Sequence, residues 1–132
     1  MAKRLGRLLI VDGQRDFACL VGAIAEQLGF ATRILLHTLD FDYVMQHWHP
    51  DVVALQVAMP DQQDVDVLKH LGQSGFQGRL VLTAEVNKGD LERAVNEARK
   101  NGLTVASTLT RSSPGDQIEA ALKPLLDLQH AA

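Results

Sequence analysis

Short apolar runs alternate along this chain with longer segments in which apolar residues recur at helical spacing. The runs predict strands and the longer segments predict helices, and this alternation favours parallel βαβ units in a doubly wound α/β sheet. The predicted strands are Leu5–Val11, Ala31–Leu36, a run within Asp51–Pro60, Arg79–Thr83 and Val105–Leu109. The predicted helices are Phe17–Leu28, Leu39–His47, a segment that follows Asp61–Asp64 and reaches Leu71, Asp90–Lys100, and a last helix that opens at Pro114 or Gly115. We expect one domain over residues 1–132, with a five-stranded flavodoxin-like sheet in the order 2-1-3-4-5 and right-handed crossovers.

Local signals mark where the helices begin and end. Asp16 is the expected N-cap of the first helix, and Gly29 the left-handed residue that closes it. Gly72 and Gly102 are expected to end two later helices. Pro124 falls inside the last apolar stripe, where it should bend the helix or restart it.

Gln56 is the most informative residue, because it is a polar side chain inside an apolar run. The run is rich in β-branched residues and reads as a strand buried on both faces, which Pro60 ends. In a parallel sheet the carboxyl ends of the strands hold the site, so Gln56 should lie at or near its floor. A neutral amide has two donors and one acceptor, and it is not a nucleophile under ordinary conditions.

Composition narrows the function classes. The chain has 132 residues, 46% of them hydrophobic and 22% charged, which is ordinary for one globular domain. A net charge of -3 gives no basis for nucleic acid as a partner. No apolar stretch approaches the roughly 20 residues that a membrane-spanning helix needs. The single cysteine, Cys19, fits a reducing cytoplasm.

Three segments together resemble the receiver domain of bacterial response regulators: Arg7–Phe17, Asp51–Pro60 and Leu80–Ala84. The resemblance runs from about Arg7 to Leu126. It implies an acidic pair after the first strand, a phosphorylatable aspartate near the end of the third, a Thr or Ser after the fourth and a Lys-Pro after the fifth.

Most of that chemistry is missing from this chain. The acidic pair is reduced to Asp12 followed by Gly13, the phosphoacceptor position holds Gln56, and the hydroxyl is kept as Thr83. Arg111 takes the lysine position in one register. The resemblance therefore implies a degenerate receiver that is not phosphorylated, binds no metal or other cofactor and is not an enzyme, since one carboxylate and an amide make a poor magnesium site. We expect a fixed network in which Asp12 accepts hydrogen bonds from backbone or Thr83, and in which Arg111 pairs with Asp12 only if Arg111 takes the lysine position.

The stretch Gly102–Arg111 resembles the fifth-strand region of receivers that precede an EAL domain. In this register Thr108 stands where such receivers carry an aromatic switch residue. An alternative register puts Leu109 or Thr110 at the lysine position instead of Arg111.

Simpler structural roles compete with these assignments. The role of Asp12 could be limited to capping the turn after the first strand. Thr83 could form a local hydrogen bond, as hydroxyls at strand ends often do. The sequence His47-Trp48-His49 has metal-binding residue types but no third ligand at a suitable spacing. The acidic residues Asp61, Asp64 and Asp66 fit a loop followed by a helix start.

The functional prediction is a cytoplasmic module that binds a protein partner or itself, independently of phosphorylation. The expected contact face combines the helix at 90–100, the strand at 105–109 and the last helix. We expect the chain to be the N-terminal part of a larger regulator with an output domain such as EAL. One alternative is a small-ligand-binding module that uses the strand-end crevice. An enzyme of another flavodoxin-like family is less favoured, because no nucleophile and base stand at a recognisable spacing.

Overall fold

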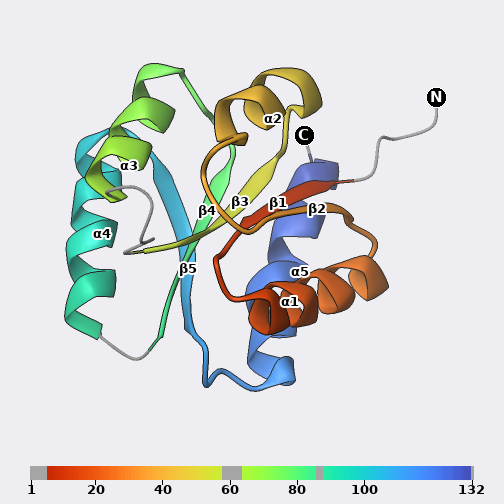
Figure 1. The fold of residues 1–132 in the computed structure, drawn as a ribbon. Helices are drawn as coiled ribbons and strands as arrows, with labels where there is room; N and C mark the ends of the chain where they lie inside the picture. Colours follow the sequence, from red (N-terminus) through yellow and green to blue (C-terminus); the bar gives the residue numbers. More distant parts are fainter. Residues whose placement is uncertain (1–5, 58–63, 86–87, 132) are drawn as a thin grey trace.

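A five-stranded parallel sheet runs through the centre of the molecule (Figure 1). The computed structural model describes residues 6–57, 64–85 and 88–131. The strands are β1 (Arg7–Val11), β2 (Ala31–Leu35), β3 (Val52–Gln56), β4 (Arg79–Ala84) and β5 (Thr104–Thr110). The helices are α1 (Arg15–Leu28), α2 (Phe41–Trp48), α3 (Asp64–Gln73), α4 (Lys88–Lys100) and α5 (Gly115–Ala131). The strand order is β2-β1-β3-β4-β5, so the predicted fold class and topology are confirmed.

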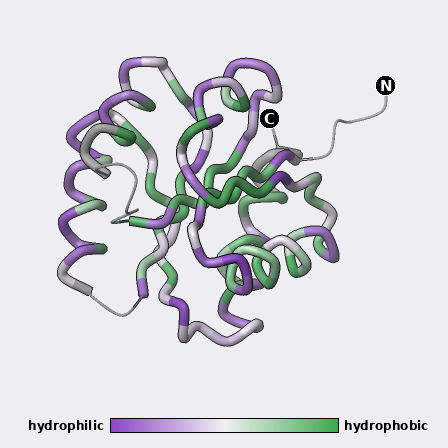
Figure 2. The backbone as a smooth tube through the Cα atoms, viewed as in Figure 1, coloured by the Kyte–Doolittle hydropathy of each residue, from purple (hydrophilic) through white to green (hydrophobic). Residues whose placement is uncertain are grey.

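The helices cover both faces of the sheet. Helices α1 and α5 lie on one face, and α2, α3 and α4 lie on the other (Figure 1). The strands form the hydrophobic centre, and polar residues concentrate toward the outside of the helices (Figure 2). This arrangement explains why the central strands read as continuous apolar runs, since both of their faces are buried. None of the helices in the described ranges is long and apolar enough to cross a membrane.

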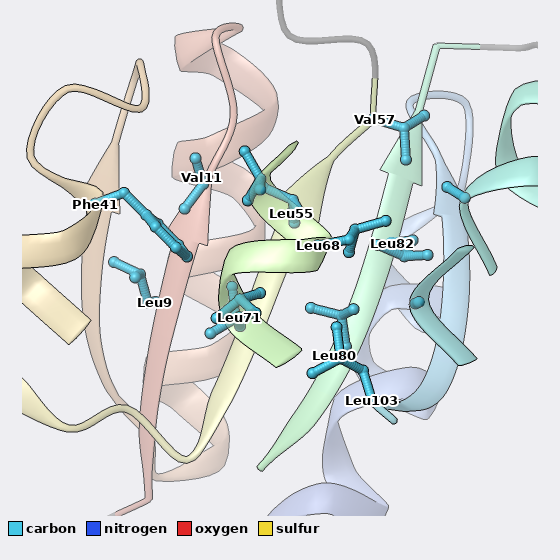
Figure 3. Close-up of a cluster of buried hydrophobic side chains, with 14 of the residues drawn as sticks. Leu9, Val11, Phe41, Leu55, Val57, Leu68, Leu71, Leu80, Leu82 and Leu103 are labelled. Atoms are coloured by element: carbon cyan, nitrogen blue, oxygen red, sulfur yellow. The ribbon is translucent and has the colours of Figure 1, made fainter. Parts of the chain in front are cut away.

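Successive residues of the central strands β1, β3 and β4 enter two separate cores, because side chains alternate across a sheet. On the α2–α4 face, Leu9, Leu55 and Leu82 pack against Leu68 and Leu71 (Figure 3). On the other face, Leu8, Ile10 and Val81 pack against α1 and α5, where the stripe predicted for α5 is buried at Ile118, Leu122 and Leu125. Each fully buried aliphatic side chain contributes roughly 1.5–3 kcal/mol relative to an exposed one.

Three of the predicted helix signals need correction. Helix α1 begins at Arg15 with Gln14 as N-cap, so Asp16 lies in the first turn. Its negative charge there interacts favourably with the helix dipole. Gly72 lies inside α3, which continues to Gln73. Pro124 lies inside a continuous α5, so the helix does not restart there, and the alternative expectation of a bend stays a prediction. The left-handed conformation expected at Gly29 is confirmed, with φ of 113°. Gly102, which was expected to end its helix, follows the end of α4 and has a φ of 78°.

A glycine is needed at position 72 of α3, because α3 and the residue that follows α4 approach closely there. A Cβ atom at this position would lie 2.5 Å from the backbone oxygen of Asn101, which is too close for two non-bonded atoms. Gly22, in the interior of α1, has only side-chain atoms of Ile34 and Ile10 near its virtual Cβ, at 3.4 and 3.6 Å. The two helical glycines therefore have different reasons to be there.

We predict opposite effects for the same substitution at these two positions. Gly72→Ala should lower the free energy of unfolding by about 1–2 kcal/mol, because forcing α4 away costs more than the helix propensity that alanine adds. Gly22→Ala should leave the stability unchanged or raise it by up to about 1 kcal/mol. Urea denaturation of both variants measures the difference, and a stabilised Gly72→Ala would contradict the close approach of the two helices.

Candidate functional site

Four polar residues lie at the carboxyl edge of the sheet. Asp12 directly follows β1, Gln56 ends β3, Thr83 lies near the end of β4, and Arg111 follows β5. Gln56 and Thr83 are register partners in neighbouring strands. The carboxyl ends of parallel strands share one edge, so four residues that are far apart in the sequence are brought into one cluster.

Asp12 is the centre of this cluster and is only 2% exposed. Its Oδ1 accepts a hydrogen bond from the backbone N–H of Gln14 and another from Nη2 of Arg111, both at 2.8 Å. Its Oδ2 lies 3.4 Å from the hydroxyl of Thr83, which donates to it. The network expected around Asp12 is therefore present. The bond to Gln14 also makes Asp12 the residue that stabilises the turn into α1, so the capping role is present beside the ion pair.

Gln56 turns its amide oxygen toward the loop after β1. Oε1 accepts a hydrogen bond of 2.8 Å from the backbone N–H of Gly13, and the side chain is half-buried. The amide nitrogen cannot take that place, because two donors would then face each other. Gln56 therefore holds the backbone of Gly13 in place through this hydrogen bond.

Arg111 enters the cluster from the turn after β5. Its side chain is 14% exposed and forms the ion pair with Asp12, while Nη1 lies 3.5 Å from Oε1 of the exposed Glu85. Its Nε is buried without a hydrogen-bond partner in the described part of the chain. Leu109 is buried in the α1–α5 core, and the hydroxyl of Thr110 lies 2.9 Å from that of Ser112. Of the three candidate residues, the structure places Arg111 against Asp12.

The other sequence candidates lie elsewhere. Thr108 pairs with Leu82 within the sheet and lines a groove between α4 and β5, away from Asp12. His47 is exposed on α2, where its ring stacks on that of Tyr43. Asp61 lies outside the described residues, as do the side chains of Asp64 and Asp66.

Glu85 is the site residue that the sequence analysis did not select. It is 75% exposed in its side chain and reaches Arg111 from the residue that follows β4. Its position two residues after the strand predicted at Arg79–Thr83 was the available signal, since residues that follow parallel strands gather at the same edge. An isolated exposed glutamate has no motif to distinguish it.

The residues present do not fit the magnesium ion that the receiver resemblance implies. Asp12 is the one carboxylate of the buried cluster, and its Oδ1 is already engaged by Gln14 and Arg111. A guanidinium 2.8 Å from that oxygen carries a positive charge that would repel a divalent cation. Among the described residues, no group of three or more His, Cys, Asp or Glu side chains could hold a metal ion.

Comparison with known proteins agrees with this architecture. No family model matches the sequence, and the search of curated proteins finds no match. Among solved structures, a response regulator from Colwellia psychrerythraea is similar, with 24% identity, a TM-score of 0.78 and coverage of 98% of this chain and 100% of that one. A CheY-like response regulator receiver domain protein from Methanospirillum hungatei JF-1 has 16% identity and a TM-score of 0.80, with coverage of 97% and 98%. The chain has the fold of a receiver domain.

A third neighbour with the receiver fold is part of a longer protein. It is the N-terminal domain of a response regulator/sensory box/GGDEF 3-domain protein from Carboxydothermus hydrogenoformans, with 17% identity and a TM-score of 0.74. The match covers 95% of this chain and 97% of that one. At these identities the likeness establishes the fold, and the activity has to be argued from the site.

The ion pair at the strand ends should be measurable as a coupling between its two members. Arg111→Met should lower the free energy of unfolding by about 3 kcal/mol, because it leaves a buried carboxylate without its counter-charge. Asp12→Ala should cost about 1–3 kcal/mol. The double variant should cost less than the sum, with a coupling of about 1–3 kcal/mol in urea denaturation.

A matched control separates this effect from the loss of an ordinary surface charge. Glu85→Gln removes the exposed partner of Arg111 and should change the stability by less than about 0.5 kcal/mol, since exposed pairs contribute little. Additive effects of Asp12→Ala and Arg111→Met would contradict a stabilising ion pair.

Proposed function

We propose that this chain is a degenerate receiver domain, a signalling module that works without phosphorylation. The observation that carries the proposal is the strand-end cluster, in which an amide stands at the end of β3 and a guanidinium is paired with Asp12. An amide oxygen that already accepts the N–H of Gly13 offers no nucleophile to a phosphoryl group. The proposed module is therefore non-enzymatic.

The same cluster supports a single resting state. Two carboxylates 4 Å apart repel each other by about 4 kcal/mol at an effective dielectric near 20, and a cluster of acids uses a cation to relieve that repulsion. Here Gln56 is neutral and Arg111 supplies a positive charge that belongs to the chain itself. With this built-in neutralisation, neither metal nor phosphate is needed to fix the arrangement.

The α4–β5–α5 face is the proposed contact surface. It holds a groove of about 620 Å³ in which Leu91 and Val95 of α4 contribute apolar side chains. Exposed polar residues, among them Asn96 and Thr108, surround these side chains. Apolar groups framed by polar ones are typical of surfaces that bind another protein. The proposed occupant is a protein partner or a second copy of the chain.

We further propose that residues 1–132 act as one domain of a larger cytoplasmic regulator with an output domain such as EAL. The receiver fold supports a role as one part of a regulator, and the unpaired Cys19 suits a reducing compartment. Binding of a small ligand in the strand-end crevice is the weaker candidate function, because the backbone N–H of Gly13 and the guanidinium of Arg111 are already engaged there.

Chemical phosphorylation tests the central claim. Incubation with acetyl phosphate and magnesium should leave the intact mass unchanged, because the strand-end position offers an amide. Gln56→Asp should also remain largely unlabelled, since Gly13 still lacks the second carboxylate and Arg111 still occupies the site. A stable adduct of one phosphoryl group on the unaltered chain would overturn the assignment as a degenerate receiver.

Self-association through the α4–β5–α5 face predicts a dimer in sedimentation equilibrium that Thr108→Arg weakens by at least about tenfold, the equivalent of 1.4 kcal/mol. The reason is that a long charged side chain would fill the groove. Thr104→Arg is the matched control, because Thr104 is an exposed residue of the same strand that does not line the groove. A monomer at every concentration, or equal effects of both variants, would contradict self-association at this face.

A further inference from the structure

Strand β2 forms one edge of the sheet, and no strand pairs with its outer side in the described part of the chain. It pairs with β1 in one continuous register from Ala31 to Leu35. An edge strand presents backbone N–H and C=O groups that can pair with another chain, and proteins commonly protect such edges with prolines, charges or bulges. The availability of this edge therefore depends on how well it is protected.

The two edges of the sheet are protected to different degrees. Strand β5, the opposite edge, has an irregular register against β4 between Leu80 and Val81, the kind of bulge that interrupts an edge. Strand β2 has a regular register and contains neither proline nor glycine. Its one charged residue is Arg33, whose guanidinium carbon lies 5.0 Å from the centre of the Trp48 ring. The charge that could protect this edge is therefore engaged with α2.

The backbone hydrogen bonds of β2 show which of its residues face outward. Ala31 donates its N–H to the carbonyl of the residue before β1, and the carbonyl of Leu35 accepts the N–H of Asp12. In a parallel ladder alternate residues bond to the same neighbour, so the odd-numbered residues of β2 face β1. The N–H and C=O groups of Thr32 and Ile34 consequently point away from the sheet.

Apolar side chains lie beside this outward-facing backbone. Ile34 is 37% exposed and lies on the α1 side of the sheet, where its Cδ1 is 3.4 Å from the position that a Cβ atom would take at Gly22. Leu36 packs against the core on the same side, and Leu35 packs against the core on the opposite side. Ile34 and Leu36 thus form a partly exposed apolar stripe along the open edge.

This edge is complementary to a second copy of itself. In an antiparallel two-fold pairing centred on Ile34, each Ile34 faces the other, and Thr32 faces Leu36 of the other copy. The alternation turns the backbone groups of these residues outward, so each facing pair can form ladder hydrogen bonds. Arg33 then faces Leu35, whereas a pairing centred on Arg33 would place two cations opposite each other, which is destabilising.

We propose that two copies of this chain associate through their β2 strands, antiparallel and centred on Ile34, and so join their two five-stranded sheets into one. The backbone ladder sets the orientation, and the Ile34 and Leu36 side chains of the two copies cover each other on the α1 side. This contact goes beyond the proposed function, because it uses none of α4, β5 and α5. The α4–β5–α5 face of each copy stays open to a protein partner.

Disulfide cross-linking of the full chain tests the register. In a Cys19→Ser background, Ile34→Cys should form a disulfide-linked dimer under mild oxidation, because hydrogen-bonded antiparallel partners have Cα atoms about 5.5 Å apart, within the range of a disulfide. Thr32→Cys is the matched control on the same face. Its two copies would lie about 13 Å apart along the ladder, too far for a disulfide. Equal cross-linking of the two variants would overturn the register.

Sedimentation equilibrium measures the association without a covalent bond. Ile34→Lys should raise the dissociation constant of the dimer by at least about tenfold, because it places a charge on the paired edge. Leu39→Lys is the control, because Leu39 is 83% exposed but lies between β2 and α2, off the strand. A monomer at concentrations up to about 1 mM, or equal effects of the two variants, would overturn the proposal.

Amide hydrogen exchange of the unaltered chain distinguishes this contact from other occupants of the edge. The N–H groups of Thr32 and Ile34 should exchange more slowly as the protein concentration rises, and Thr108→Arg should preserve that change. Protection that does not depend on concentration would show that the chain covers its own edge, and would overturn the proposal. Loss of the change in Thr108→Arg would assign the dimer to the α4–β5–α5 face, with the same consequence. A degenerate receiver would survive either result, because labelling by acetyl phosphate tests that claim separately.

Discussion

The ion pair between Asp12 and Arg111 is the interaction on which the strand-end region depends. It joins the end of β1 to the turn after β5, across 99 residues of sequence. Because Asp12 is buried, the cost of removing its charge from water has to be offset locally, and Arg111 together with the N–H of Gln14 provides that compensation. In this pair the carboxylate of Asp12, which could bind a metal ion, and the guanidinium of Arg111, which could bind an anion, bind each other.

The parallel sheet makes this pairing possible. Its two cores fix the strands from both faces, so the residues that follow each strand are held in place by packing and not by their own contacts. Gln56 is positioned in this way by β3, and its amide then orders Gly13 through one hydrogen bond. Because packing fixes the fold, the polar residues at the edge of the sheet can change, and a catalytic or metal-binding function can be lost, while the fold is kept.

This separation of shape from chemistry is what the proposed binding role requires. One surface groove lies between α4 and β5, and another lies between α1 and the turn after β5. Arg111 lies between the buried Asp12 and the exposed Glu85, so the internal network and the second of these grooves share one side chain. The electrostatic field at this surface is therefore set partly from within, because the buried Asp12 offsets the positive charge of Arg111.

The sequence alone determined the element order, the topology and the polar character of Gln56, because strand and helix periods, turn residues and short connections are local properties. It also placed Asp12, Thr83 and Gln56 at strand ends, where parallel strands must bring them together. It could not decide whether Arg111, Leu109 or Thr110 faces Asp12, since that depends on how β5 and its bulge align with β4. Gly72 and Glu85 show the same limit: a close approach between α3 and α4, and a contact between two loops, arise only when distant segments pack.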